Sequence, residues 1–167
     1  MGRHRSLVAA VLIMGALSGC AGTSTAEACR LVGVQNGIGI RIAGPVAEQV
    51  GTAELVVCWD TACQRRQVML LPSSTVTDNG CADGGPDAAC AADAVATGDK
   101  VGFAAVADLP PSPVEVTLSL ADATGAEFVA ETVTLTAKQV NVPGVGCGSG
   151  LQGHIDVDAE ADVRPNA

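Results

Sequence analysis

Few residues of this chain could act as a nucleophile or a general base. The sequence contains two histidines, His4 and His154. Because His4 lies in the positively charged N-terminal segment, a Ser-His-Asp triad would have to use His154. Ser149 lies nearby, but the sequence CGSGL at 147–151 differs from the Gly-x-Ser-x-Gly pattern of a nucleophile elbow. We therefore predict no catalytic residue and expect His154 to be a surface residue in a loop.

Carboxylates are spaced along two segments in a way that calcium sites also use. The first set lies between two hydrophobic stretches, and the second alternates near the C-terminus: Asp78, Asp83, Asp87 and Asp93, then Asp156, Asp158, Glu160 and Asp162. Oxygen-rich loops bind Ca²⁺, but the EF-hand spacing is absent. Glycoside hydrolysis would need a cleft with sugar-stacking neighbours, which nothing indicates. We interpret the first set as solvated turn residues and the second as an acidic tail. Calcium binding is the alternative, and we predict no metal and no cofactor.

Cys20 follows a segment that indicates export. Arg3 and Arg5 precede an uncharged apolar run, Leu7 to Leu17. As a helix this run spans only roughly 16 Å, whereas a hydrocarbon core is about 30 Å thick. It therefore fits a secretory signal. Leu17-Ser18-Gly19-Cys20 resembles the bacterial lipobox, which implies cleavage before Cys20 and acylation of its sulfur, a firm anchor when two or more chains are attached. An ordinary secretory signal is the alternative.

The predicted division of the chain follows from this signal. We expect a signal peptide at 1–19, a flexible tether at 20–28, a β-sandwich domain at 29–158 and a C-terminal tail at 159–167. Removal of the signal leaves seven Lys and Arg residues against 18 Asp and Glu, a net charge of −11. Such a chain repels phosphate backbones, so we expect no nucleic-acid partner. Its predicted location is extracytoplasmic, on the bacterial cell membrane, with membrane lipid as a partner through acylated Cys20.

The six remaining cysteines form an even set, which in an exported domain indicates disulfides. Sequence alone allows 15 pairings of six cysteines. Spacing favours one bond across a four-residue hairpin loop, one around the sequence ADGGPDAA and one between the two ends of the domain. In that scheme the pairs are Cys58–Cys63, Cys81–Cys90 and Cys29–Cys147. Thiolate metal binding usually needs Cys-x-x-Cys or His spacing, which is absent.

Hydrophobic residues alternate along most of the mature chain, which predicts strands with one buried face. Seven or eight strands of this kind, separated by turn residues, indicate an all-β, Ig-like antiparallel β-sandwich. In Glu127–Thr136 the alternation changes phase, so we expect a bulge near Glu131 or Thr132. The predicted strands are Ile38–Ile42, Ala53–Trp59, Gln64–Leu71, Lys100–Ala107, Val114–Leu120, Glu127–Thr136 and Ile155–Val157.

One segment, Pro72–Asp99, interrupts this pattern. Its 28 residues are small, polar and acidic, and only Asp87–Ala96 fits a short helix, with Asp87 as its cap. A loop of this length is usually functional or disordered. We therefore place a candidate binding surface here, with Asp83 and Asp87 as its residues.

Aromatic residues are scarce in the mature chain. It contains Trp59, Phe103 and Phe128 and no tyrosine. We expect both phenylalanines in the core and Trp59 packed over the Cys58–Cys63 disulfide. The alternative for Trp59 is an exposed contact at the hairpin tip, which makes it a further candidate for binding. Platforms for sugars and anchors for tight interfaces rely on aromatic side chains, so this composition disfavours both.

Three motifs resemble a group of small lipoproteins from actinobacteria. They are the early Cys29, the hairpin from Cys58 to Arg65, and the sequence PGVGC at 143–147. The resemblance implies a sandwich fold and an envelope location, but no catalytic residue and no defined function. The segment between Cys81 and Cys90 has no counterpart in that plan.

These observations favour a non-enzymatic envelope lipoprotein that binds a protein or a small ligand through its loops. A structural or spacer role without a specific ligand is the second hypothesis. A secreted hydrolase or metal-assisted enzyme, which would use His154 or an acidic cluster, is the third.

Overall fold

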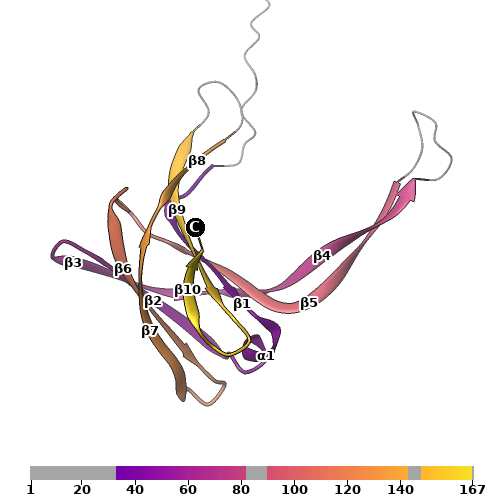
Figure 1. Cartoon of the computed structure of the whole chain (residues 1–167), viewed down its shortest axis with the longest axis horizontal. Coiled ribbons are helices and arrows are strands. Elements are labelled where there is room, and N and C mark those ends of the chain that lie inside the picture. Colours follow the sequence, from indigo (N-terminus) through magenta and orange to yellow (C-terminus); the bar gives the residue numbers. More distant parts are fainter. Residues whose placement is uncertain (1–32, 82–89, 143–147, 167) are drawn as a thin grey trace, which may run out of the picture.

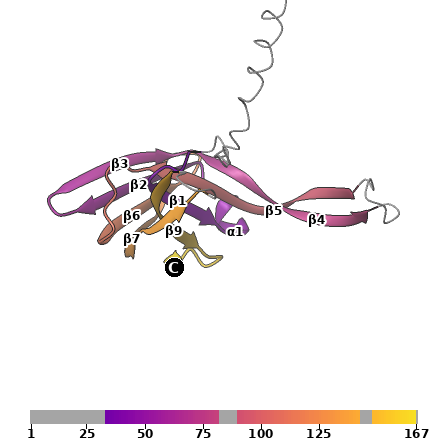
Figure 2. The same ribbon diagram turned by 90° about the horizontal axis from the view of Figure 1, so that it is seen from above.

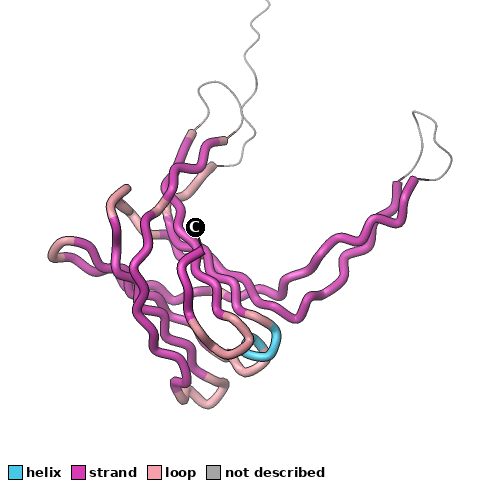
Figure 3. The backbone as a smooth tube through the Cα atoms, viewed as in Figure 1, coloured by secondary structure: helices cyan, strands magenta, loops and turns pink. Residues whose placement is uncertain are grey.

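The structure, a computed structural model, describes residues 33–81, 90–142 and 148–166. Within these ranges the chain forms an all-β sandwich of ten strands with one short helix, so the predicted fold class is confirmed (Figures 1 and 3). The elements are β1 (Gly37–Ile42), α1 (Gly44–Ala47), β2 (Thr52–Trp59), β3 (Ala62–Val68), β4 (Leu70–Cys81), β5 (Cys90–Ala105), β6 (Pro113–Ala121), β7 (Glu127–Thr136), β8 (Lys138–Asn141), β9 (Ser149–Val157) and β10 (Val163–Asn166).

The strands form two sheets that differ in size and in strand direction. The smaller sheet has the order β3-β2-β6-β7 and is antiparallel throughout. The larger sheet has the order β10-β9-β1-β5-β4, with β8 also paired to β9. In it, β1 runs parallel to β9, which departs from the predicted purely antiparallel arrangement. Because more than 100 residues separate these two strands in sequence, no short hairpin constrains their direction.

Period-two patterning places the core between the sheets. Ile38, Ile40 and Ile42 of β1 are buried, and so are the apolar residues of β2 and β6 that alternate with solvated ones. The inward residues of β6 are Val114, Val116, Leu118 and Leu120. Alternation therefore determines which face of these strands is buried, as predicted.

Strand β7 differs from the prediction in its phase. Val129, Val133 and Leu135 face the core in one uninterrupted alternation, so no bulge lies at Glu131 or Thr132. The register shift with β6 occurs instead between Leu120 and Ala121, at the hairpin end. Consequently Phe128 points outward and is 39% exposed, which corrects its expected place in the core.

The described parts of the segment Pro72–Asp99 are strands and not a loop, and the predicted helix at Asp87–Ala96 is wrong over the part that is described. Residues from Cys90 onward belong to strand β5, which pairs with β4. Alanine favours helices, but here cross-strand pairing decides the conformation, and β-branched residues such as Thr75, Val76 and Val95 suit it. The proposed helix cap Asp87 lies outside the described residues.

The C-terminal segment 159–167, expected to be a tail, contains strand β10. It pairs antiparallel with β9, with Val163 opposite Val157 and Asn166 opposite His154. The two strands are joined by a turn in which the Asp158 carboxylate accepts hydrogen bonds from the backbone of Glu160 and Asp162. The alternating acids are therefore divided between a strand and a turn instead of lining one extended face.

Two of the three expected disulfides lie within the described residues, and both are present. Cys58–Cys63 closes the β2–β3 hairpin, and Cys81–Cys90 joins the ends of β4 and β5. Cys20, Cys29 and Cys147 fall outside the described residues, so their predicted roles stay predictions.

Candidate functional site

The most distinctive feature of the molecule is a two-stranded hairpin that extends beyond the sandwich (Figures 1 and 2). We call residues Ser74–Cys81 of β4 and Cys90–Gly98 of β5 the arm. Every arm residue is exposed, and none belongs to the hydrophobic core. The arm therefore contributes nothing to burial in the sandwich, although it takes up a substantial part of the chain.

The arm is held by local interactions because it lacks a core. Cys81–Cys90 joins its ends, and the Asn79 side-chain amide donates to the Asp93 carboxylate at 2.7 Å. Gly80, at a φ of 79°, adopts a left-handed conformation that favours glycine. An isolated hairpin is marginally stable in water. The disulfide thus crosslinks the part of the structure that has no core to stabilise it.

Asp99 fixes the base of the arm to the sandwich. One carboxylate oxygen accepts from the Arg41 guanidinium at 2.7 and 3.0 Å, and the other accepts from the Gly44 amide at 3.0 Å. The Asp99 side chain is 12% exposed, whereas that of Arg41 is 61% exposed. The hydrogen bond and charge of Asp99 raise the pKa of Arg41, with a smaller contribution from Asp156. This cluster links β5 to β1 and to the start of α1.

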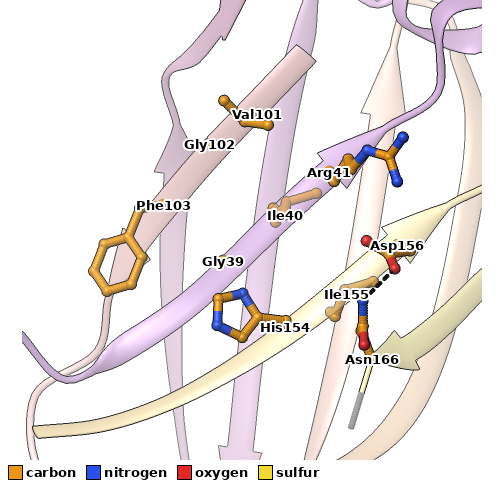
Figure 4. Close-up of a pocket in the computed structure, with 10 residues that line it drawn as sticks. All are labelled: Gly39, Ile40, Arg41, Val101, Gly102, Phe103, His154, Ile155, Asp156 and Asn166. Atoms are coloured by element: carbon orange, nitrogen blue, oxygen red, sulfur yellow. Dashed lines mark hydrogen bonds between the residues drawn. The ribbon is translucent and has the colours of Figure 1, made fainter. Parts of the chain in front are cut away.

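A shallow groove of about 380 Å³ lies on the outer face of the larger sheet, away from the core (Figure 4). Register places Phe103, Gly39, His154 and Asn166 side by side in one row across β5, β1, β9 and β10. The next row contains Val101, Arg41, Asp156 and Arg164. The side of the groove formed by β5 is therefore apolar, and the side formed by β9 and β10 is polar.

Glycines form the floor of this groove and allow aromatic rings to lie across β1. A methyl group on Gly39 would meet Nδ1 of His154 at 2.5 Å, and one on Gly37 would meet the Phe103 ring. The rings thus shield backbone that glycine leaves bare, a known device for stabilising glycine in strands. Phe103, expected in the core, is 39% exposed on this outer face.

The groove does not assemble the groups of a hydrolase. Ser149 and His154 lie on the same extended strand, β9, so five residues separate them by roughly 16 Å and place them on opposite faces. His154 is exposed in a strand, not in the expected loop. Asp156 accepts a hydrogen bond from the Asn166 side-chain amide at 2.6 Å. The geometry therefore supplies no nucleophile–base pair here.

The acidic turn after β9 is partly neutralised by a cation of the chain itself. Arg164 lies 2.9 Å from the Asp158 carboxylate and 3.0 Å from that of Asp162. Hydrogen bonding to Asp162 and the charges of both acids raise the pKa of Arg164. In the part of the chain that the structure describes, no group of three or more His, Cys, Asp or Glu side chains is arranged to hold a metal ion.

Of the three predicted binding residues, the structure describes Trp59. Trp59, at the end of β2, is partly buried and packs against the core. The β2–β3 turn that follows it lies at the opposite end of the molecule from the arm (Figure 1). Asp83 and Asp87 lie outside the described residues, between the two cysteines at the arm's tip. Sequence reasoning missed the arm as a strand pair, although the β-branched run at Thr75–Thr77 was a signal for it.

Comparison with known proteins finds no match: no family model, no curated protein and no solved structure is similar to this chain. Over the described ranges, the structure holds no helix with the length and apolar character that crossing a membrane requires.

Proposed function

We propose that this protein is a lipid-anchored envelope lipoprotein that works without catalysis, as a binding module whose arm makes the contact. Cys20 would carry the lipid, the segment after it would be the tether, and the sandwich would be the rigid base. The single observation that carries the binding role is the fully exposed arm, which contains no core residue and ends in a disulfide.

The arm supports this role on energetic grounds. Ordering a residue costs about 1–2 kcal/mol of backbone entropy, and a segment that buries nothing regains little of it within its own chain. The Cys81–Cys90 disulfide and the Asp99 carboxylate nevertheless hold the arm in place. Binding of a second molecule would bury the arm and offset the entropy lost in ordering it.

The anchor is tested by following lipid on the protein in the cells that make it. Wild-type protein should incorporate an alkyne-labelled fatty acid and fractionate with the membrane. Cys20→Ala should do neither. Incorporation that persists in Cys20→Ala, or a wild-type protein that stays unprocessed in the cytosol, would contradict the anchor.

The contact is tested with a photo-crosslinking amino acid placed on the arm at position 76 and, as the control, on the exposed face of β7 at position 134. We expect a discrete crosslinked species from position 76 only. A variant in which residues 74–97 are replaced by Asn-Gly should keep the sandwich, since none of the described residues in that range belongs to the core. If this variant, expressed in a deletion strain, restores every property that the deletion removed, the arm is not the functional element.

The second candidate is a spacer without a specific ligand. The observation in its favour is the shallow groove, which assembles no reactive pair. A spacer would tolerate loss of the arm, so the same shortened variant separates the two functions.

A further inference from the structure

The free edge of β4 along the arm differs from the other sheet edges of the molecule. Strand β4 ends the larger sheet, and among the strands that the structure describes it pairs with β5 alone. An unpaired edge offers backbone donors and acceptors to another chain, and proteins usually block such edges with charges, proline or short strands. The arm's edge lacks these devices from Ser74 to Thr77.

Each other edge carries at least one of them. Strand β3 has Arg65 and Arg66, and β7 has Glu127 and Glu131. The four-residue strands β8 and β10 are short, and they contain Lys138 in β8 and Arg164 with Pro165 in β10. On β4 such devices lie at Pro72 and Asp78, so the open stretch of this edge is Ser74–Thr77.

The partner strand of the arm, β5, carries Asp93 and is covered at the base of its own edge. At the base of the arm the backbone of Gly98 lies against Gly44, which begins α1. The β4 edge has no such cover. An added strand would therefore align with β4 and lie beside Val76, which is 71% exposed, on one face and Thr75 on the other. Val95 of β5, opposite Thr75, is 50% exposed and extends that second face.

Charge indicates which kind of strand fits. The described residues of the arm include two aspartates and no Lys, Arg or His. Asp78 and Asp93 lie on the arm itself, with Asp78 directly on β4. Opposite charges on neighbouring strands stabilise pairing, whereas like charges oppose it. A segment with basic residues beside β-branched ones complements this edge.

We propose that the arm binds an extended, basic peptide segment of another protein by β-strand addition to the free edge of β4. Main-chain hydrogen bonds would supply the affinity, and side-chain pockets and charges the specificity, as in other cases of strand addition. This inference rests on the proposed binding function and names its mode and partner.

The test uses the full chain, purified in detergent, and a fluorescein-labelled peptide of eight residues that alternates Lys with Val or Thr. We expect an increase in anisotropy on binding, and binding that weakens as ionic strength rises. Two control peptides should fail to bind. One carries N-methyl groups on alternate amides, and the other has Glu in place of Lys.

A matched pair of variants locates the binding edge. Val76→Lys places a positive charge on the arm and should weaken binding at least about tenfold. Val140→Lys makes the same change at an exposed valine of β8 and should leave binding unchanged. Proline substitutions through Ser74–Thr77 give a second readout, because those whose amide faces the free edge should abolish binding while the arm stays formed.

Several results would overturn the inference. They are equal binding of the N-methylated peptide, no binding of the basic peptide, or equal losses in Val76→Lys and Val140→Lys. Self-association that Val76→Lys abolishes, without peptide binding, would show that a second copy takes this edge. If the peptides fail but crosslinking at position 76 persists, strand addition fails and the binding function stands. If the arm proves dispensable in cells, the binding function itself fails.

Discussion

At the scale of single residues, two glycines of β1 leave room for aromatic rings on the outer face of the larger sheet. Gly37 and Gly39 alternate with the core isoleucines of β1, so their missing side chains face outward. Phe103 and His154 lie on the flanking strands and cover them. The two glycines differ in what a larger residue would meet.

Gly37→Ala should destabilise the protein by about 1–3 kcal/mol, the usual cost of overpacking, because its methyl group would meet the carbonyl oxygen of Ala104 as well as a ring. Gly39→Ala should cost less, since the His154 ring that it meets can rotate away. Urea unfolding followed by the fluorescence of Trp59 measures both. Equal losses would show that the His154 ring cannot move.

Asp122 gives a pH-dependent contribution at a hairpin turn. Its carboxylate accepts from the Thr124 hydroxyl at 2.6 Å, the Thr124 amide at 2.8 Å and the Ala126 amide at 3.0 Å. The Thr124 hydroxyl, followed by these amides, lowers the pKa of Asp122 below 3.8. Because the folded pKa is the lower one, the stabilisation is present above pH 3.8 and is lost as the pH falls through the folded pKa.

We therefore expect Asp122→Asn to be less stable than wild type at neutral pH, with the difference shrinking at lower pH. Asn keeps an oxygen acceptor in the turn, so the variant isolates the charge from the geometry. Urea midpoints measured across the acid range provide the check. A difference that stays constant with pH would show that charge at Asp122 is not involved.

At the scale of elements, the two disulfides have different tasks although both close hairpins. Cys58–Cys63 lies at the end of β2, a strand that contributes Leu55 and Val57 to the core. Cys81–Cys90 lies at the end of the arm, where no core residue is present. The first stabilises a part of the sandwich, and the second stabilises the arm alone.

The double variant Cys81→Ser/Cys90→Ser should speed amide hydrogen exchange in the arm and leave the melting temperature of the sandwich unchanged. Cys58→Ser/Cys63→Ser is the matched control. It should lower global stability by about 2 kcal/mol on the chain-entropy account of a short loop. Exchange mass spectrometry and thermal unfolding separate these effects. An arm that keeps its protection without its disulfide would contradict the assignment.

At the scale of the whole molecule, one carboxylate links the base of the arm to the sandwich. Asp99 joins β5 to Arg41 of β1 and to the first residue of α1. These contacts lie at the base of the arm, so a small change there is magnified at its end (Figure 2).

Asp99→Ala removes both contacts and should broaden the distribution of molecular dimensions in small-angle X-ray scattering. Its cost in stability should be about 1–3 kcal/mol, because the Gly44 amide and the Arg41 guanidinium lose a common partner. Asp99→Asn keeps an acceptor for the amide but loses the ion pair, so an intermediate effect is expected. Scattering unchanged in Asp99→Ala would show that the strands themselves fix the arm.

The sequence by itself determined the all-β class and the buried face of β6 and favoured two short-range disulfides, because these depend on neighbours in the chain. Alternation from Val114 to Leu120 needs no partner to indicate its inward face. Cys58 and Cys63 are close enough in sequence that a hairpin brings them together. Signals of this kind are local, so they survive without knowledge of the rest of the fold.

Tertiary structure alone decided the phase of β5 and the pairing of strands distant in sequence. Near the sandwich both faces of β5 carry apolar side chains. The larger ones, Val101 and Phe103, favoured their own face as the one that packs in the core. The core instead takes Ala104 and Val106, because register with β1 puts Phe103 opposite Gly39 on the outer face. The parallel pairing of β1 with β9 and the extension of β4 and β5 into the arm likewise depend on backbone partners that no local pattern specifies.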